Sequence, residues 1–265
     1  MKDIWKEANL PMTEYTWFYD VDYRNDPDKI IKEVQKIKYP LIVKPATTGS
    51  SVGINVCDNE KSLREAIDEA LQYDNKIIVE EVVENLKEVN IAVMGNYESQ
   101  KVSEIEEVLS GNKFLTYQDK YIGGGKKLKG GIKVPRGKSK GMASTNRKLP
   151  ADLSSKMRKE IEDIAVKAFK VLGAAGNSRI DFLIDDKKEK VYINEINSIP
   201  GSLAFYLWEA KGEDFTKVLD DMITIGIKDY KKRMSKTHSF ETNILAGFAS
   251  NGGLKGAKGV KGKLK

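Results

Sequence analysis

The strongest constraint on the fold is a pair of short segments in which polar and apolar residues alternate. Residues 178–185 and 190–197 flank a polar turn, and this pattern predicts two antiparallel strands. Because side chains alternate along a strand, one face of this hairpin should be apolar and the other ionic. The polar residues expected on that second face are Arg179, Asp181, Glu195 and Asn197.

This polar face predicts a metal site. Carboxylate and amide oxygens suit Mg²⁺, which takes one or two carboxylates together with substrate phosphates. The other interpretation is a solvent-facing strand pair with ordinary surface charges. We favour the metal site because the second strand leads into Ser198-Ile199-Pro200-Gly201-Ser202, a turn that opens a short apolar helix. Free backbone donors in such a turn can hold an anion.

The remaining elements mix helices and strands. Helical spacing of apolar residues predicts helices that end before residue 39, span 60–73, run from about 150 to 172, and span 214–230. Short apolar runs predict strands at 41–43, 54–56, 77–83 and 88–95. Strands grouped around hairpins favour an α+β architecture over a doubly wound parallel sheet.

Composition excludes several classes of protein and locates the charge. A hydrophobic content of 40% supports a folded core, and one cysteine with one histidine excludes a disulfide framework or a zinc cluster. The net charge is +6, yet residues 120–148 hold ten Lys or Arg and residues 251–265 hold five Lys, so the remainder carries 6 − 10 − 5 = −9. We expect a long basic lid loop at 122–148 and a disordered tail from 251.

A second candidate site is the glycine-rich hairpin tip at 49–53. Glycine lets backbone N–H groups approach a phosphate closely, and serine hydroxyls add donors. Lys44 precedes it in an apolar strand, where an amine is costly unless it faces an anion. A third cluster, with Glu80 and Glu81, ends the next strand; it is either an exposed strand end or a hinge that presents a carboxylate to a base.

The order of these parts resembles the ATP-grasp carboxylate–amine ligases, most closely the D-alanine:D-alanine ligase group. The stretches that carry the resemblance are YPLIVKPATTGSSVGI (39–54), IIVEEVVENLKEVNIAVMG (77–95), TYQDKYI (116–122), RIDFLID (179–185) and NEINSIPG (194–201). The resemblance covers roughly residues 1–225. It implies two α+β subdomains that clasp ATP, at 1–84 and 85–230, followed by a tail at 231–265.

The resemblance implies a role for each matching residue in binding ATP. Lys44 and Lys120 would neutralise the phosphates, and the hairpin with Gly49, Ser51 and Val52 would close over them. The residues implied to line the adenine hinge and to hold the ribose are Glu80, Glu81 and Val83 for the hinge and Glu88 for the ribose.

The resemblance also implies the residues of the reaction. Asp181, Glu195 and Asn197 would bind two Mg²⁺ ions, for which Mn²⁺ is an alternative. Arg179 would stabilise the acyl phosphate and the tetrahedral species. The residues implied to hold the substrates are Ser50 and Tyr121 at the lid, and Gly201 and Ser202 at the acceptor's carboxylate. A carboxylate would attack the γ-phosphate of ATP, and an amine would then attack the acyl phosphate.

The sequence departs from the family in two places. Family members begin with a further N-terminal domain that binds the first amino acid, and this sequence lacks it. We therefore expect the chain to be a truncated form, one half of a split protein, or a module that takes this domain from a separate domain or chain. After Gly201 the sequence reads Ser-Leu-Ala-Phe-Tyr-Leu-Trp, where the ligases carry small polar residues. These apolar residues form either a core helix or a pocket for an acceptor other than free D-alanine.

Three functional hypotheses follow. The first is a cytoplasmic D-alanine:D-alanine ligase-type enzyme of peptidoglycan biosynthesis, with amino-acid substrates and a possible homodimer. The second is an ATP-grasp ligase for another amino acid or peptide. The third is a catalytically incomplete ATP-binding fragment that needs a missing N-terminal domain, or a nucleotide-binding or interaction module whose basic loop and tail bind an anionic partner. We expect no nucleic acid partner and no membrane span, since no apolar run approaches the roughly 18–20 residues that a membrane helix needs.

Overall fold

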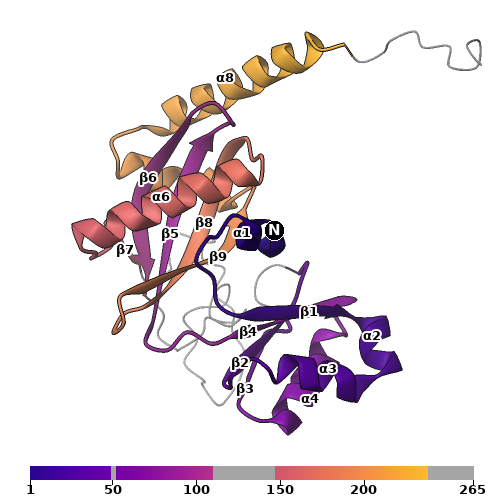
Figure 1. Cartoon of the computed structure of the whole chain (residues 1–265). Coiled ribbons are helices and arrows are strands. Elements are labelled where there is room, and N and C mark those ends of the chain that lie inside the picture. Colours follow the sequence, from indigo (N-terminus) through magenta and orange to yellow (C-terminus); the bar gives the residue numbers. More distant parts are fainter. Residues whose placement is uncertain (49–51, 110–146, 238–265) are drawn as a thin grey trace, which may run out of the picture. The chain divides into compact units, whose positions relative to one another are not determined.

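The computed structural model describes residues 1–48, 52–109 and 147–237 (Figure 1). The predicted tail from 251 lies outside these residues, as does the predicted basic lid except for Arg147 and Lys148. The chain forms two compact units, Met1–Ile225 and Gly226–Lys265, and helix α8 (Phe215–Met234) begins in the first and ends in the second. The predicted subdomain boundary at residue 84 stays a prediction.

A four-stranded antiparallel sheet in the order β1-β4-β2-β3 is built from the first 81 residues. Its strands are β1 (Tyr15–Tyr19), β2 (Leu41–Pro45), β3 (Asn55–Cys57) and β4 (Lys76–Glu81). The helices of this part are α1 (Lys2–Glu7), α2 (Asp20–Asn25), α3 (Pro27–Val34) and α4 (Glu60–Ala70). Helix α4 begins at a reciprocal cap, in which the Asn59 side chain accepts from the Ser62 amide, and it buries Leu63 and Ile67 in the core.

A five-stranded antiparallel sheet follows, in the order β7-β6-β5-β8-β9. Its strands are β5 (Leu86–Gly95), β6 (Gln100–Val108), β7 (Arg147–Lys148), β8 (Gly176–Asp185) and β9 (Lys190–Asn197). The predicted hairpin is β8 with β9, and a β-bulge interrupts its register between Asp181 and Phe182. A bulge of this kind re-aims side chains at the edge of a sheet.

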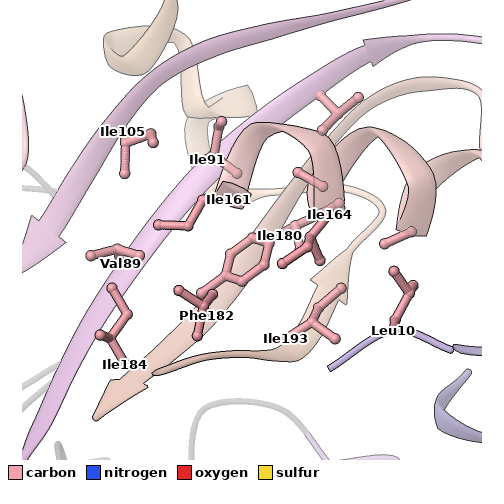
Figure 2. Close-up of a cluster of buried hydrophobic side chains, with 14 of the residues drawn as sticks. Leu10, Val89, Ile91, Ile105, Ile161, Ile164, Ile180, Phe182, Ile184 and Ile193 are labelled. Carbon is pink, nitrogen blue, oxygen red and sulfur yellow. The ribbon is translucent and has the colours of Figure 1, made fainter. Parts of the chain in front are cut away.

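One face of the five-stranded sheet packs against helix α6 (Ser155–Val171) (Figure 1). Ser154 caps the first turn by accepting from the Met157 amide, and Gly173 follows the last turn with a φ of 64°. Figure 2 shows the Phe182 ring between isoleucine side chains of the strands and of α6. This face holds the apolar half of the predicted alternation, including Ile180.

The opposite face is apolar at one end and polar at the other. The apolar end packs against the turn η2 (Gly201–Ala204), helix α7 (Phe205–Glu209) and the start of α8, which bury Leu207, Trp208 and Val218. The apolar residues after Gly201 therefore contribute mainly to the core. The polar end is left for a site.

The predicted α+β class is confirmed, because antiparallel sheets and helices are grouped along the chain as expected. Among the residues that the structure describes, no helix combines the length and apolar character needed to cross a membrane.

Candidate active site

Four polar side chains form a row across the polar end of the five-stranded sheet. The register pairs Glu106 of β6 with Asn90 of β5, Asn90 with Asp181 of β8, and Asp181 with Glu195 of β9. Paired residues of antiparallel strands project from the same face. The next row pairs Arg179 with Asn197, so the face sharing expected from the sequence is present.

Asp181 is the centre of the site. Arg179 donates to it twice, from Nε to Oδ1 at 2.6 Å and from Nη2 to Oδ2 at 2.7 Å, and the Asn197 amide donates to Oδ2 at 3.1 Å. Burial raises the pKa of the Asp181 carboxyl to about 6, and the nearby Glu195 adds to this effect, which outweighs the Arg179 charge. Glu195 itself is exposed.

Glu106 anchors a second network that the sequence analysis did not find. Its buried carboxylate accepts from Asn90 at 3.1 Å, from the Tyr206 hydroxyl at 2.7 Å and from Arg147 at 2.9 Å. The Arg147 guanidinium also lies 4.4 Å from the centre of the Tyr206 ring. Both Tyr206 and Glu106 contribute to the electrostatic environment of Arg179, so the network borders the Asp181 site.

A lysine site lies on the four-stranded sheet. Lys44 of β2 contacts the buried carboxylate of Glu80 on β4, and Lys2 of α1 lies 2.5 Å from the other oxygen of Glu80. The Lys44 ammonium also donates to Asn194 Oδ1 at 3.5 Å. Asn194 is the extra residue of the β9 bulge, so the bulge turns an amide toward Lys44.

The charges of the two sites act on each other. Burial works against the charged form of Lys44, but Glu80, Glu195 and Glu88 outweigh it and raise the pKa of Lys44. The ammonium therefore stays charged, and Glu195, one of the carboxylates predicted to bind metal, contributes to this. A lysine ammonium close to carboxylates suits the binding of a polyphosphate together with a divalent cation, because the ammonium contacts the phosphates and the carboxylates bind the cation.

The predicted metal ligands fit Mg²⁺ in their chemistry. Two carboxylates and one amide converge across β8 and β9, and hard oxygens of this number leave coordination positions for substrate phosphates and water. Over residues 1–48, 52–109 and 147–237 there is no group of three or more His, Cys, Asp or Glu that could hold a metal by itself. A metal at Asp181 would therefore need ligands beyond the protein's carboxylates.

The predicted adenine residues differ in position. Glu81 and Val83 line a cavity of about 170 Å³, together with residues that include Tyr39 and Tyr192. Glu80 instead points into the lysine site. The ribose role of Glu88, which lies on β5 and contributes to the field at Lys44, stays a prediction.

Several predicted residues lie outside the described ranges, and these are Gly49, Ser50, Ser51, Lys120 and Tyr121. Val52 is described and partly buried. The roles predicted for all of them stay predictions.

The predicted acceptor turn has an unusual backbone. Ser202, Leu203 and Ala204 have φ values of 52°, 53° and 48°, a left-handed conformation that is costly for residues other than glycine. Asn177 of β8 holds this turn: its amide donates to the Leu203 carbonyl at 2.6 Å and its oxygen accepts from the Trp208 indole at 3.2 Å. Strain of this kind concentrates at functional sites.

Comparison with known proteins identifies relatives of this chain. It is 39% identical over 244 residues to a D-alanine–D-alanine ligase of Thermosipho africanus, which covers 92% of this chain and 61% of the relative. It is 34% identical over 229 residues to a ligase of the same name from Clostridium acetobutylicum, covering 84% of this chain and 61% of the relative. The chain thus spans about three fifths of the length of these curated relatives.

Solved structures give the same picture. The VanG D-Ala:D-Ser ligase from Enterococcus faecalis superposes with a TM-score of 0.67 at 27% identity, over 84% of this chain and 59% of that one. The D-alanine–D-alanine ligase from Coxiella burnetii has the same fold, with a TM-score of 0.67 at 21% identity, over 95% of this chain and 60% of that one.

The family model described as "D-ala D-ala ligase C-terminus" matches residues 4–224. This confirms the resemblance seen in the sequence. The chain belongs to the D-alanine–D-alanine ligase C-terminus family and has the ATP-grasp fold.

Proposed function

We propose that this protein is an ATP-dependent carboxylate–amine ligase of the D-alanine:D-alanine ligase type. The observation that carries the proposal is the joint placement of Asp181, Glu195 and Asn197 on one face, with Arg179 among them. Lys44 contacts Asn194 on β9, the strand that also carries Glu195 and Asn197. Family membership supports the proposal independently.

In this mechanism Lys44 binds the phosphates of ATP, and the cavity lined by Glu81 and Val83 takes the adenine. Asp181, Glu195 and Asn197 would hold Mg²⁺, whose charge would offset the negative charge that builds up on the phosphates. A substrate carboxylate oxygen attacks the γ-phosphorus and ADP leaves. The amine of the second substrate then attacks the acyl carbon, phosphate leaves with the bonding electrons, and the nitrogen loses a proton to solvent as the amide forms.

Arg179 stabilises the oxyanion of the tetrahedral species. Its Nε and Nη2 groups are fixed on Asp181, which holds the guanidinium in one orientation, and Nη1 takes no part in that pair. A donor fixed before the reaction costs no reorganisation as charge develops. The Asp181 carboxylate thereby has two roles: it would bind the metal ion, and it accepts the hydrogen bonds that orient Arg179.

A second candidate is a ligase of the same mechanism with an acceptor other than D-alanine. The turn at Gly201 and Ser202 is followed by partly buried Leu203, Phe205 and Tyr206, which differ from the small polar residues expected for D-alanine. The VanG relative is named for D-serine, so the family name alone does not fix the acceptor.

The proposal includes further features of the enzyme. These are two Mg²⁺ ions, subdomains divided at residue 84, a cytoplasmic location, a role in peptidoglycan biosynthesis, a possible homodimer and a contribution from a separate N-terminal domain or chain. Ser50, Tyr121 and Lys120 belong to the proposal in the same way.

The test is phosphate release from ATP and Mg²⁺ in the presence of D- and L-amino acids. D-alanine-stimulated release supports the first candidate, and stimulation by another amino acid supports the second. Glu195→Ala should abolish the release, whereas the exposed Glu160→Ala on α6 is the matched carboxylate control. Release that survives Glu195→Ala would contradict the metal assignment. Binding of ATP without release would mean that residues beyond this chain complete the reaction.

A further inference from the structure

Glu80 is shared by two lysines from different parts of the chain. Its side chain is only 2% exposed, and each carboxylate oxygen has its own ammonium: Lys2 at Oε1 and Lys44 at Oε2. Burial favours the neutral acid, but the two cations outweigh it and lower the pKa of Glu80 to about 2. The centre is therefore one buried anion between two cations at neutral pH.

The two lysines are not equivalent. The Lys44 side chain is 19% exposed and its ammonium also touches Asn194, whereas the Lys2 side chain is 9% exposed. Lys44 is thus the more exposed of the two side chains, and Lys2 contacts the other oxygen of Glu80. Burial also lowers the pKa of Lys2, so Lys2 depends on Glu80 for its charge as Glu80 depends on Lys2.

Helix α1 holds Lys2 in place. One turn after Lys2, the fully buried Trp5 donates its indole N–H to the Ala168 carbonyl of α6 at 3.2 Å. Between them, Asp3 accepts from the Tyr15 hydroxyl of β1 at 2.7 Å. Lys2 is thus a fixed counterion, while Lys44 has a second partner available.

We propose that Lys2 is a positioning residue that keeps Glu80 neutralised when Lys44 turns from Glu80 to a nucleotide phosphate. This inference rests on the proposed function, because it takes ATP as the ligand of Lys44. A buried carboxylate without a counterion is costly. Without Lys2, Lys44 is the remaining counterion of Glu80. If Lys44 then moves to a phosphate, it leaves a buried carboxylate without a counterion, so the affinity for the nucleotide phosphates falls.

The test measures binding of the non-hydrolysable analogue AMP-PNP with Mg²⁺, and of adenosine, to the full chain by calorimetry. Lys2→Met should weaken AMP-PNP binding about tenfold or more and leave adenosine binding unchanged. Lys2→Arg restores the charge and should restore binding of AMP-PNP. The matched control is Lys6→Met, which removes an exposed lysine of the same helix and should change neither ligand.

A second substitution separates positioning from a structural role. Glu80→Gln in the Lys2→Met background removes the charge that retains Lys44, so the double variant should bind AMP-PNP more tightly than Lys2→Met. If Lys2→Met does not fold, Glu80→Gln is compared with the double variant Lys2→Met, Glu80→Gln. These two should bind AMP-PNP with equal affinity, and a weaker affinity of the double variant overturns the proposal.

Other outcomes also overturn it. If the unaltered chain binds AMP-PNP and Lys2→Met binds it equally well, Lys2 has no positioning role, although the proposed function stands. An equal loss of AMP-PNP and adenosine in Lys2→Met would mean a general structural defect. If the unaltered chain binds no AMP-PNP, the proposed function and this inference both fall.

Discussion

Replacing Glu106 by alanine should destabilise the protein strongly, because this one carboxylate accepts from three donors. Asn90, Tyr206 and Arg147 each lose their hydrogen bond to this carboxylate in Glu106→Ala. Breaking a buried ion pair by removing one partner costs about 3–5 kcal/mol. The Arg147 side chain is 18% exposed and regains some contact with water, so we expect the lower end, about 3 kcal/mol.

The assay is urea unfolding followed by circular dichroism, with a thermal scan as a second measurement. A loss of about 3 kcal/mol corresponds to a fall of roughly 6–12 °C in Tm for a unit of this size. The double variant Glu106→Leu with Arg147→Met replaces both charges by apolar groups and should recover the part of the loss that comes from the broken ion pair, while the Asn90 and Tyr206 hydrogen bonds stay unmade. A Glu106→Ala variant within about 0.5 kcal/mol of the unaltered protein would refute the account of Glu106 as a buried anchor.

Two further predictions concern stability. Phe169→Ala empties a fully buried site between α6 and the sheet and should cost about 3–5 kcal/mol in urea unfolding, whereas Val171→Ala on the exposed side of α6 should cost less than about 0.5 kcal/mol. Because the pKa of Glu80 falls from 4.5 to about 2 on folding, its contribution is fully present above pH 4.5 and is lost as the pH falls toward 2. The stability advantage over Glu80→Gln, on the order of 3 kcal/mol at pH 7, should shrink over that range; an advantage that stays constant down to pH 2 would contradict the assignment.

The sequence was sufficient to predict the fold class and the faces of the β8–β9 hairpin. Strand alternation is a local property, so the positions of Arg179 and Asp181 against Ile180 follow from spacing alone. The Glu60–Ala70 helix was predictable for the same reason, because its apolar residues recur at helical spacing. These predictions do not depend on which strands pair in the sheet.

The Glu106 network could not be predicted, because it depends on pairing between distant strands. Asn90 and Glu106 are neighbours only through the β5–β6 register, and Tyr206 reaches Glu106 from a helix one hundred residues later. Glu106 is one of three glutamates in a strand with only three apolar residues, so nothing in the sequence marks it as the buried one. Asn194 was missed because a bulge shifts the alternation by one residue.

Lys2 shows the same limit more sharply. Its segment reads as a short polar helix, and nothing in the spacing of Lys2 and Lys6 distinguishes a buried lysine from an exposed one. The distinction arises from Trp5, which fixes the rotation of α1 and so directs Lys2 toward Glu80.

The buried charges of this protein are better explained by ligand binding than by stability. An ion pair such as Arg179–Asp181 can usually be replaced by apolar residues of similar volume without loss of stability, so stability alone gives no reason to keep it. Here the Lys2–Glu80–Lys44 centre reaches β9, the strand beside Asp181, through the contact of Lys44 with Asn194, and Glu195 acts on the charge of Lys44. Charges that are held in place before a ligand arrives lower the reorganisation needed when phosphates and a metal ion bind. The clustering therefore supports a site for a charged nucleotide, and it explains why the second cation of Glu80 matters: the carboxylate that holds Lys44 ready must remain neutralised when Lys44 moves to the phosphate.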